Sequence, residues 1–250
     1  MKHELIRFYR FIQLFGIIHG TRLFFNFILN KFNDIKIPFI KSSITLRPGT
    51  SDPKAFYQIF VEKEYDLTFP DNPKIIVDGG ANIGLFTILM KNRFPDVKII
   101  SIEPDKDNFK ILQKNVGSYS DIHCENCGIW HKATTLKVYD KYEIGKWGMV
   151  VEEDNDEGNI AALSIDAIMN KYAIDRIDIL KLDIETSEKK VFMHNYERWL
   201  PKVKMIIIEL HDWMEDDCAK PFFTAINNTF NRYEYNIKGE NTIIVNKDLE

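Results

Sequence analysis

Ionisable side chains follow two apolar runs in the C-terminal half of the chain. Asp183 and Glu185 follow the run IDILKL, and the run VKMIII is followed by Glu209, His211 and Asp212. Carboxylates and imidazoles are the side chains that accept a proton from a reacting hydroxyl group. His211 is the first candidate base, because imidazole titrates near neutrality. Asp183 is a second candidate, which could instead hold the substrate or contact a cofactor, and Glu209 is a third.

The same side chains are possible ligands of a divalent cation. Asp183, Glu209, His211 and Asp212 offer oxygen and nitrogen atoms of the kinds that bind Mg²⁺ or a similar ion. Three acids and a histidine that follow two strands are nevertheless too unspecific a pattern to identify a metal site. The sequence therefore assigns no metal ligand, and a divalent metal is the less favoured alternative.

A glycine-rich turn within residues 75–86 (IIVDGGANIGLF) forms the second group of candidates. A dinucleotide fingerprint requires G-x-G-x-x-G, and Ala81 stands at the third position when the pattern starts at Gly79. A P-loop requires a lysine where Leu85 stands. The carboxylate of Asp78, just before the turn, would repel a pyrophosphate and attract a cation. The turn is therefore predicted to bind an ammonium or sulfonium group rather than phosphates.

A further acid, Glu103, ends the next apolar run, nineteen residues beyond Gly84. An acid at this place in an α/β sheet accepts hydrogen bonds from ribose hydroxyl groups. Asp78 and Glu103 together suit S-adenosylmethionine, with Asp78 beside its amino-acid part and Glu103 on its ribose. Gly80 and Gly84 would let the backbone approach the ligand closely. Asn126, after the third expected strand, is placed to contact the adenine.

Alternating strands and helices must position these residues. Strands are expected at 74–80, 97–105, 121–129, 177–185, 203–211, 232–238 and 241–247, with a short one just before Pro48 and two edge strands at 134–140 and 147–153. Strand–helix alternation predicts a parallel sheet with helices on both faces, and the closing hairpin adds one antiparallel strand. Ligands of such sheets bind at the carboxyl ends of the strands. Aromatic faces suit sugar stacking, and Trp130, Trp147 and Trp213 lie in or near the loops after strands.

The N-terminal segment differs from the rest of the chain in charge. Residues 1–50 contain eight lysines and arginines against two acids, although the whole chain has a formal net charge of -4. Residues 4–30 are predicted to form one or two helices with a break near Gly16 to Gly20, and no uncharged stretch there is long enough to span a bilayer. We expect a helical cap packed on the domain, or alternatively a peripheral contact with an anionic membrane face.

Composition limits the class of protein. A net negative charge argues against nucleic acid as a partner. Three cysteines in 250 residues do not form a disulfide scaffold and indicate a reducing compartment. We therefore expect a cytoplasmic protein, with peripheral contact at the inner face of the membrane as the alternative. The oligomeric state does not follow from the sequence.

Several separated motifs resemble the FkbM family of S-adenosylmethionine-dependent methyltransferases. They are RPGTSDPKAFYQIFVEKEYD, VDGGANIGLF, SIEPD, LSIDAI, DILKLDIETSE and IIIELH. The resemblance covers about residues 44–246, so the chain divides into a basic, apolar helical cap at 1–43 and a methyltransferase domain at 44–250. It implies an α/β, Rossmann-like class I methyltransferase fold, with a seven-stranded sheet of order 3-2-1-4-5-7-6 and strand 7 antiparallel.

The resemblance implies methyl transfer to an oxygen of a sugar, glycan or other small acceptor. The predicted catalytic residues are His211, Asp183 and Glu209, and the predicted cofactor-binding residues are Asp78, Gly79, Gly80, Ala81, Asn82, Gly84, Glu103, Pro104, Asn126 and Asp183. One position departs from the family pattern, because Thr186 stands where the family has glycine. Either the turn is recast or the acceptor pocket differs there. The alternative function is an inactive module that binds the cofactor and regulates or scaffolds other proteins.

Overall fold

A seven-stranded sheet forms the centre of the molecule. The computed structural model describes residues 2–32, 34–139, 150–154, 158 and 160–249. The strands are β1 (Ile75–Gly79), β2 (Lys98–Ile102), β3 (Ile122–Glu125), β8 (Ile177–Leu182), β9 (Val203–Glu209), β10 (Tyr233–Lys238) and β11 (Asn241–Asn246). Their spatial order is β10-β11-β9-β8-β1-β2-β3, and only β11 runs against the others. Numbered along the chain, this order is 3-2-1-4-5-7-6, and the prediction is confirmed.

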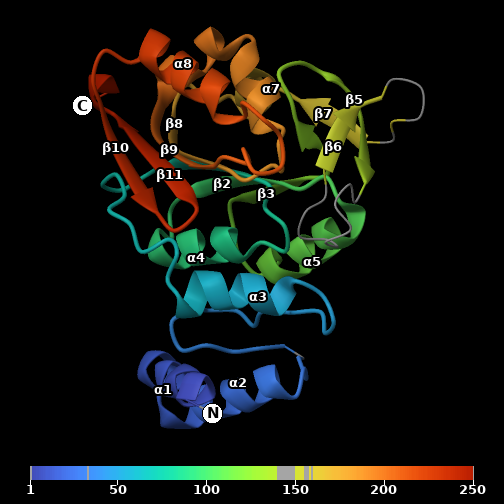
Figure 1. Cartoon of the computed structure of the whole chain (residues 1–250), viewed down its shortest axis with the longest axis vertical. Coiled ribbons are helices and arrows are strands. Elements are labelled where there is room, and N and C mark those ends of the chain that lie inside the picture. Colours follow the sequence, from blue (N-terminus) through green and yellow to red (C-terminus); the bar gives the residue numbers. More distant parts are fainter. Residues whose placement is uncertain (1, 33, 140–149, 155–157, 159, 250) are drawn as a thin grey trace.

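Helices cover both faces of the sheet (Figure 1). Alternate strand residues point to opposite faces, so Ile76 belongs to the hydrophobic cluster on one side and Val77 to the cluster on the other. Helices α4 (Leu85–Arg93) and α5 (Lys106–Val116) lie on the first side. The second side carries α6 (Ile165–Lys171), α7 (Glu188–Met193) and α8 (Ala219–Thr229), with the short 3-10 turns η2 (Tyr196–Arg198) and η3 (Leu200–Lys202). A last 3-10 turn, η4 (Lys247–Leu249), follows β11.

A second, four-stranded sheet interrupts the alternation. Its order is β4-β7-β5-β6, with β4 (Gly128–Ile129), β5 (Thr134–Tyr139), β6 (Val150–Glu153) and β7 (Ile160–Leu163). The two expected edge strands are the antiparallel pair β5 and β6, although residues 140–149, with Trp147, lie outside the described residues. The expected strand 121–129 is in fact two strands that belong to different sheets. It breaks at Asn126, because that side chain hydrogen-bonds to two backbone carbonyls of the preceding loop.

The N-terminal segment folds as two helices that break at Gly16, within the range predicted, and the two helices pack as a hairpin. Helix α1 (Lys2–Phe15) ends before Gly16, whose φ of 79° breaks the helix, and α2 (Ile17–Ile28) follows. A Cβ atom at Gly20 would lie 2.4 Å from the carbonyl oxygen of Phe11, so glycine permits the two helices to pack closely. The prediction of a short strand before Pro48 is wrong. Among the described residues, that segment forms a single β-bridge, between Ile44 and Ile35. Within the described residues, every helix is too short or too polar to cross a membrane.

One hydrophobic cluster joins the hairpin to the main domain. Helix α3 (Asp52–Phe56) and the π-helical turn η1 (Tyr57–Val61) lie between the hairpin and the α4–α5 layer (Figure 1). The ring of Phe56 is fully buried and lies 6.4 Å from that of Phe15 and 5.4 Å from that of Phe27. The same cluster includes Ile83 and Leu85 beside the glycine-rich turn. The hairpin therefore supports the elements that carry the turn.

We expect Phe56→Ala to lower the free energy of unfolding by about 3–5 kcal/mol, because it leaves a cavity where the hairpin meets the domain. Phe25→Ala is the matched control: that ring is 51% exposed, and its loss costs less than about 1 kcal/mol. Urea unfolding followed by circular dichroism and tryptophan fluorescence measures both. We expect the hairpin and the main domain to unfold together. Two separate transitions in the wild-type protein would contradict this expectation.

Candidate active site

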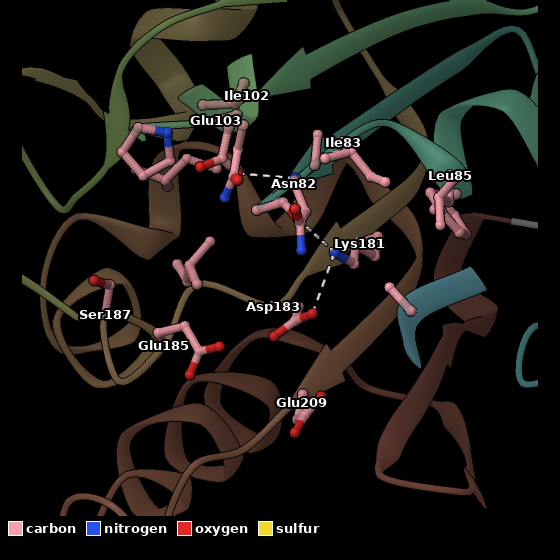
Figure 2. A pocket seen from close by; sticks show the side chains of 18 of the residues that line it. Asn82, Ile83, Leu85, Ile102, Glu103, Lys181, Asp183, Glu185, Ser187 and Glu209 are labelled. Atoms are coloured by element: carbon pink, nitrogen blue, oxygen red, sulfur yellow. Dashed lines mark hydrogen bonds and ion pairs between the residues drawn. The ribbon is translucent and has the colours of Figure 1, made fainter. Parts of the chain in front are cut away.

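A pocket opens at the carboxyl ends of β1, β2, β8 and β9, the edge where ligands of such sheets bind. Its walls include three residues of the α3–η1 segment and three of the β3–β4 region: Ala55, Gln58, Ile59, Cys127, Gly128 and Ile129. Figure 2 shows Glu103 and Asn82 at one end of the pocket, and Asp183, Glu185 and Glu209 at the other. The sheet thus brings most of the sequence-predicted residues together.

The glycine-rich turn is held by close backbone packing. Gly80 has a φ of 72°, and a Cβ atom there would lie 1.7 Å from the carbonyl oxygen of Asp183. The N–H groups of Gly80 and Ala81 both donate to the carbonyl oxygen of Ile102. Gly84 has a φ of 85° and packs against Leu112 of α5. These two glycines are therefore required by contacts with β8 and α5, in addition to any approach of a ligand.

Glu103 lies at one end of the pocket, and two backbone N–H groups hold its carboxylate in place. Its Oε2 atom accepts from the N–H of Asn82 at 2.8 Å, and its Oε1 atom accepts from the N–H of Asp105 at 2.9 Å. The side chain is buried, and burial raises its pKa to about 7 despite these two donors. Each carboxylate oxygen has a second lone pair for a ligand hydroxyl group. The residue thus retains the capacity that the ribose assignment requires.

Asn126 fixes the loop next to Glu103 and is not among the residues that line the pocket. Its amide donates to the carbonyl oxygens of Glu103 and Pro104, at 2.8 and 3.0 Å. The pocket wall at this place is formed by the next two residues, Cys127 and Gly128. The structure therefore gives Asn126 a positioning role, which differs from the expected contact with adenine.

Asp78 also lies behind the pocket wall. It is fully buried, its Oδ2 atom accepts from Thr87 Oγ1 at 2.6 Å, and its Oδ1 atom lies 3.6 Å from Nζ of Lys181. Lys181 lines the pocket and donates to the carbonyl oxygen of Gly80 at 2.8 Å. Asp78 itself is not among the residues that line the pocket. The direct contact expected between Asp78 and a cationic ligand therefore differs from this arrangement, in which the carboxylate faces Lys181.

Four carboxylates surround the buried imidazole of His211. Nδ1 lies 3.4 Å from Glu188, and Nε2 lies 3.4 Å from Glu185, 3.5 Å from Glu209 and 3.8 Å from Asp183. Burial alone would lower the pKa of His211, but the carboxylates outweigh it and raise the pKa to about 10. Both imidazole nitrogens therefore carry protons at neutral pH. This charge state counts against His211 as the group that removes a proton from a substrate.

Two of the carboxylates have raised pKa values. Burial and the neighbouring charge of Asp183 raise the pKa of Glu209 to about 8, and the same two causes raise the pKa of Glu185 to about 8, while His211 opposes both shifts. A carboxylate of raised pKa is a stronger base than an ordinary one. Both side chains accept a proton only in their ionised forms, which prevail above about pH 8, whereas the imidazole of His211 loses its proton only near pH 10. Glu209 and Glu185 are therefore better proton acceptors than His211 in weakly alkaline solution.

One group of side chains could reach a shared divalent ion. Ligand atoms of Asp183, Glu209 and His211 all lie within 4.8 Å of one another. The protonated imidazole already supplies positive charge at this place, so the ion would have to displace a proton from Nε2 before binding. Asp212 is not in this group, since its carboxylate accepts from the N–H of Ala219 at the start of α8.

The turn after β8 keeps the shape of the expected glycine turn although it carries threonine. Glu185 has a φ of 50° and Thr186 a φ of 74°, both in the left-handed region. A β-branched residue is strained there. The turn aims Glu185 at His211, and the N–H of Ile184 donates to Oε1 of Glu188 at 2.7 Å. The threonine therefore stores backbone strain next to the end of the pocket that carries Glu185 and Glu209.

Several pocket residues lie outside the set predicted from the sequence. Glu64 and Tyr65 line the pocket, as does Glu240 from the β10–β11 turn. The signal for the first two was present, because the family-like motif that begins at Arg47 ends in EYD. Another acid of that motif, Asp52, is buried and binds the Arg47 guanidinium through both oxygens, at 2.8 and 2.9 Å. Its role is to hold the motif in place.

The sheet order, the glycine-rich turn and the pocket at the strand ends define a class I methyltransferase fold. The model of the methyltransferase FkbM domain matches residues 78–237. The chain therefore belongs to the FkbM methyltransferase family, as the motifs predicted, and it is a methyltransferase.

Relatives in fungi and bacteria support this assignment. The chain is 29% identical to methyltransferase sdnD of Sordaria araneosa, over 62% of this chain and 73% of that protein. It is 27% identical to methyltransferase 1 of Beauveria bassiana, over 62% and 72%. The crystal structure of methyltransferase FkbM from Methylobacillus flagellatus superposes with a TM-score of 0.54 at 18% identity. That match covers 97% of this chain but 59% of the longer one, and it shows the shared fold.

We expect Thr186→Gly to raise the free energy of unfolding by about 1 kcal/mol relative to Thr186→Ala, because glycine adopts a φ of 74° without steric cost. Both variants remove the same buried side-chain atoms beyond Cβ, so the comparison isolates the backbone strain. Chemical unfolding of the two proteins measures the difference. Equal stability would show that the turn relaxes around the Cβ atom and stores no strain.

Proposed function

We propose that this protein transfers a methyl group from S-adenosylmethionine to a hydroxyl oxygen of a sugar, a glycan or another small acceptor. The observation that carries the proposal is the two-ended pocket, with Glu103 at one end and the carboxylate–imidazole cluster at the other (Figure 2). Family membership supports the methyl transfer. The nature of the acceptor is our inference from the side chains at the second end.

The described residues suit an adenosyl cofactor. Glu103 offers two acceptor oxygens to the ribose, and the adjoining wall of Pro104 and Ile129 is apolar, as a flat base requires. Lys181 and His211 together face a larger number of carboxylates, so the pocket favours a positively charged ligand. When bound, S-adenosylmethionine supplies a methyl group on a sulfonium, which needs no covalent help from the protein.

The reacting end of the pocket must orient the acceptor hydroxyl and take its proton. Glu209 is our candidate base, because it lines the pocket and burial raises its pKa to about 8. The imidazolium of His211, 3.5 Å away, holds this carboxylate in place. Asp183 lines the same space beside Lys181 and is placed to accept a second hydrogen bond from the acceptor or the cofactor. His211 thus acts as a positioning group in this proposal.

An exposed indole at the rim supports a sugar acceptor. Trp213 lines the pocket, is 70% exposed and lies with its ring centre 6.3 Å from that of His211. Stacking of a sugar ring on an exposed indole face buries apolar C–H groups while the hydroxyl groups remain free to react. Trp130, by contrast, is buried in the small sheet and has no such role.

We expect S-adenosylhomocysteine to bind about tenfold more tightly at pH 8 than at pH 6. Burial raises the pKa of Glu103 to about 7, so the side chain is neutral below this pH and a full hydrogen-bond acceptor above it. Isothermal titration across this range measures the effect. Glu103→Gln should bind weakly at every pH, with a flat profile. Tight binding by Glu103→Gln would remove the carboxylate from the cofactor site.

We expect Glu209→Gln to lower kcat by about 10²–10⁴-fold while the dissociation constant for S-adenosylhomocysteine changes by less than about threefold, because the amide cannot accept the proton. Glu197→Gln, an exposed acid of η2, is the control and should retain full activity. Methyl transfer is followed as S-adenosylhomocysteine release over a panel of monosaccharides and glycans.

The same assay tests the two alternatives. A wild-type protein that binds the cofactor but transfers no methyl group to any acceptor in the panel would support an inactive regulatory or scaffold module. Loss of turnover on adding EDTA, with recovery on adding Mg²⁺, would show that Asp183, Glu209 and His211 hold a divalent ion instead of working as proposed here.

A further inference from the structure

Large apolar side chains are exposed on the N-terminal hairpin. Eight of them, on α1, α2 and the residue that caps α2, are at least half exposed: Leu5, Ile6, Tyr9, Ile17, Ile18, Phe25, Ile28 and Leu29. Ile17 and Ile18 are the most exposed, at 74% and 82%. Scattered apolar residues on a surface need no explanation, but a group on one supersecondary unit marks an interaction site.

The exposed side chains share the outer face of the hairpin. Ile18 and Phe25 of α2 and its C-cap residue Leu29 follow one another at helical spacing. Leu23 and Phe24, on another side of α2, are buried against the domain. Helix α1 repeats the pattern, with Leu5 and Tyr9 exposed and Phe11 and Phe15 buried. Packing on the domain needs the inner face only. The apolar outer face is therefore surplus to the fold.

Basic residues border this face. Arg10, Arg22 and Lys31 are exposed, and Glu4 is the single acid among residues 4–31. The first fifty residues carry a surplus of six positive charges, and the rest of the chain is acidic. An apolar face edged by arginine and lysine matches the interface of an anionic bilayer. A second copy of the same face would bring like charges together, so the charge pattern favours a lipid surface over self-association.

The position of the hairpin suits such a contact. It forms the outermost layer of the molecule, beyond α3 and far from α7 and α8 (Figure 1). Its helices cannot span a bilayer. We propose that the outer face of α1 and α2 lies in the headgroup region of an anionic membrane, with the acidic part of the domain turned away from the lipid. This inference is independent of the methyl acceptor.

The contact also bears on the pocket. The ring of Phe11 on the inner face of α1 lies 6.0 Å from that of Tyr57 in η1, and the next residues of η1, Gln58 and Ile59, line the pocket. The hairpin and this wall of the pocket therefore form one packed unit. A protein docked through its outer face holds the wall at a fixed distance from the lipid.

Vesicle flotation of the full chain tests the proposal. We expect the protein to float with vesicles of phosphatidylglycerol and phosphatidylcholine, to float less as salt rises, and to remain unbound with phosphatidylcholine alone. The double variant Ile17→Ser and Ile18→Ser should weaken binding at least about tenfold, since two apolar side chains no longer enter the interface. Arg10→Gln with Arg22→Gln should weaken binding to anionic vesicles and leave the fold intact.

The matched control is Tyr235→Ser with Ile237→Ser, two exposed apolar residues on β10. This variant should float like the wild type. Equal flotation with charged and neutral vesicles, or equal flotation of the Ile17/Ile18 and β10 variants, would overturn the proposal. So would a stable dimer in sedimentation analysis that the Ile17/Ile18 variant alone dissociates, in the absence of any flotation, because the face would then bind a second copy.

Discussion

The buried ammonium group of Lys181 joins the two halves of the site. It donates to the carbonyl oxygen of Gly80, and it lies 3.6 Å from Asp78 and 3.5 Å from Asp183. Burial opposes its charge, but the three surrounding acids Asp183, Asp78 and Glu209 outweigh burial and raise its pKa. A buried charge is stable only with such partners. Lys181 therefore adds a charged link between the glycine-rich turn after β1 and Asp183 after β8, alongside the parallel pairing of the two strands.

The two ends of the pocket differ in electrostatics. At the Glu103 end, backbone N–H groups of Asn82 and Asp105 satisfy one carboxylate, and no second charge is needed. At the other end, the carboxylates outnumber Lys181 and His211, and burial together with the charge of Asp183 raises the pKa values of Glu185 and Glu209. A purely structural cluster of this kind would be unfavourable. Its place beside the pocket supports the proposed site, which would attract a cation and accept a proton.

The sequence predicted the backbone architecture better than the directions of the side chains. The alternating apolar runs predicted a mostly parallel sheet with one antiparallel strand. The strand order itself came from the resemblance to the FkbM family. The partners of individual side chains were harder to predict, as Asn126 and Asp78 show. Both residues lie at the expected strand ends. The amide of Asn126 nevertheless donates to the carbonyl oxygen of Pro104, and the carboxylate of Asp78 faces Lys181. The charge state of His211 could not be foreseen, because Glu188 reaches it from a different element.

The turn at Glu185 and Thr186 shows how the site tolerates strain. Two consecutive left-handed residues are costly, and a threonine at the second makes them more so. The compensation lies in Glu188, whose buried carboxylate accepts from the N–H of Ile184 and lies beside Nδ1 of His211. Relaxation of the turn would break the first contact and withdraw a counter-charge from the imidazolium. The backbone strain of the turn and the charge of His211 are thus coupled through the carboxylate of Glu188. A glycine at position 186 would keep both contacts of Glu188 and would remove the steric cost of a side chain at this φ.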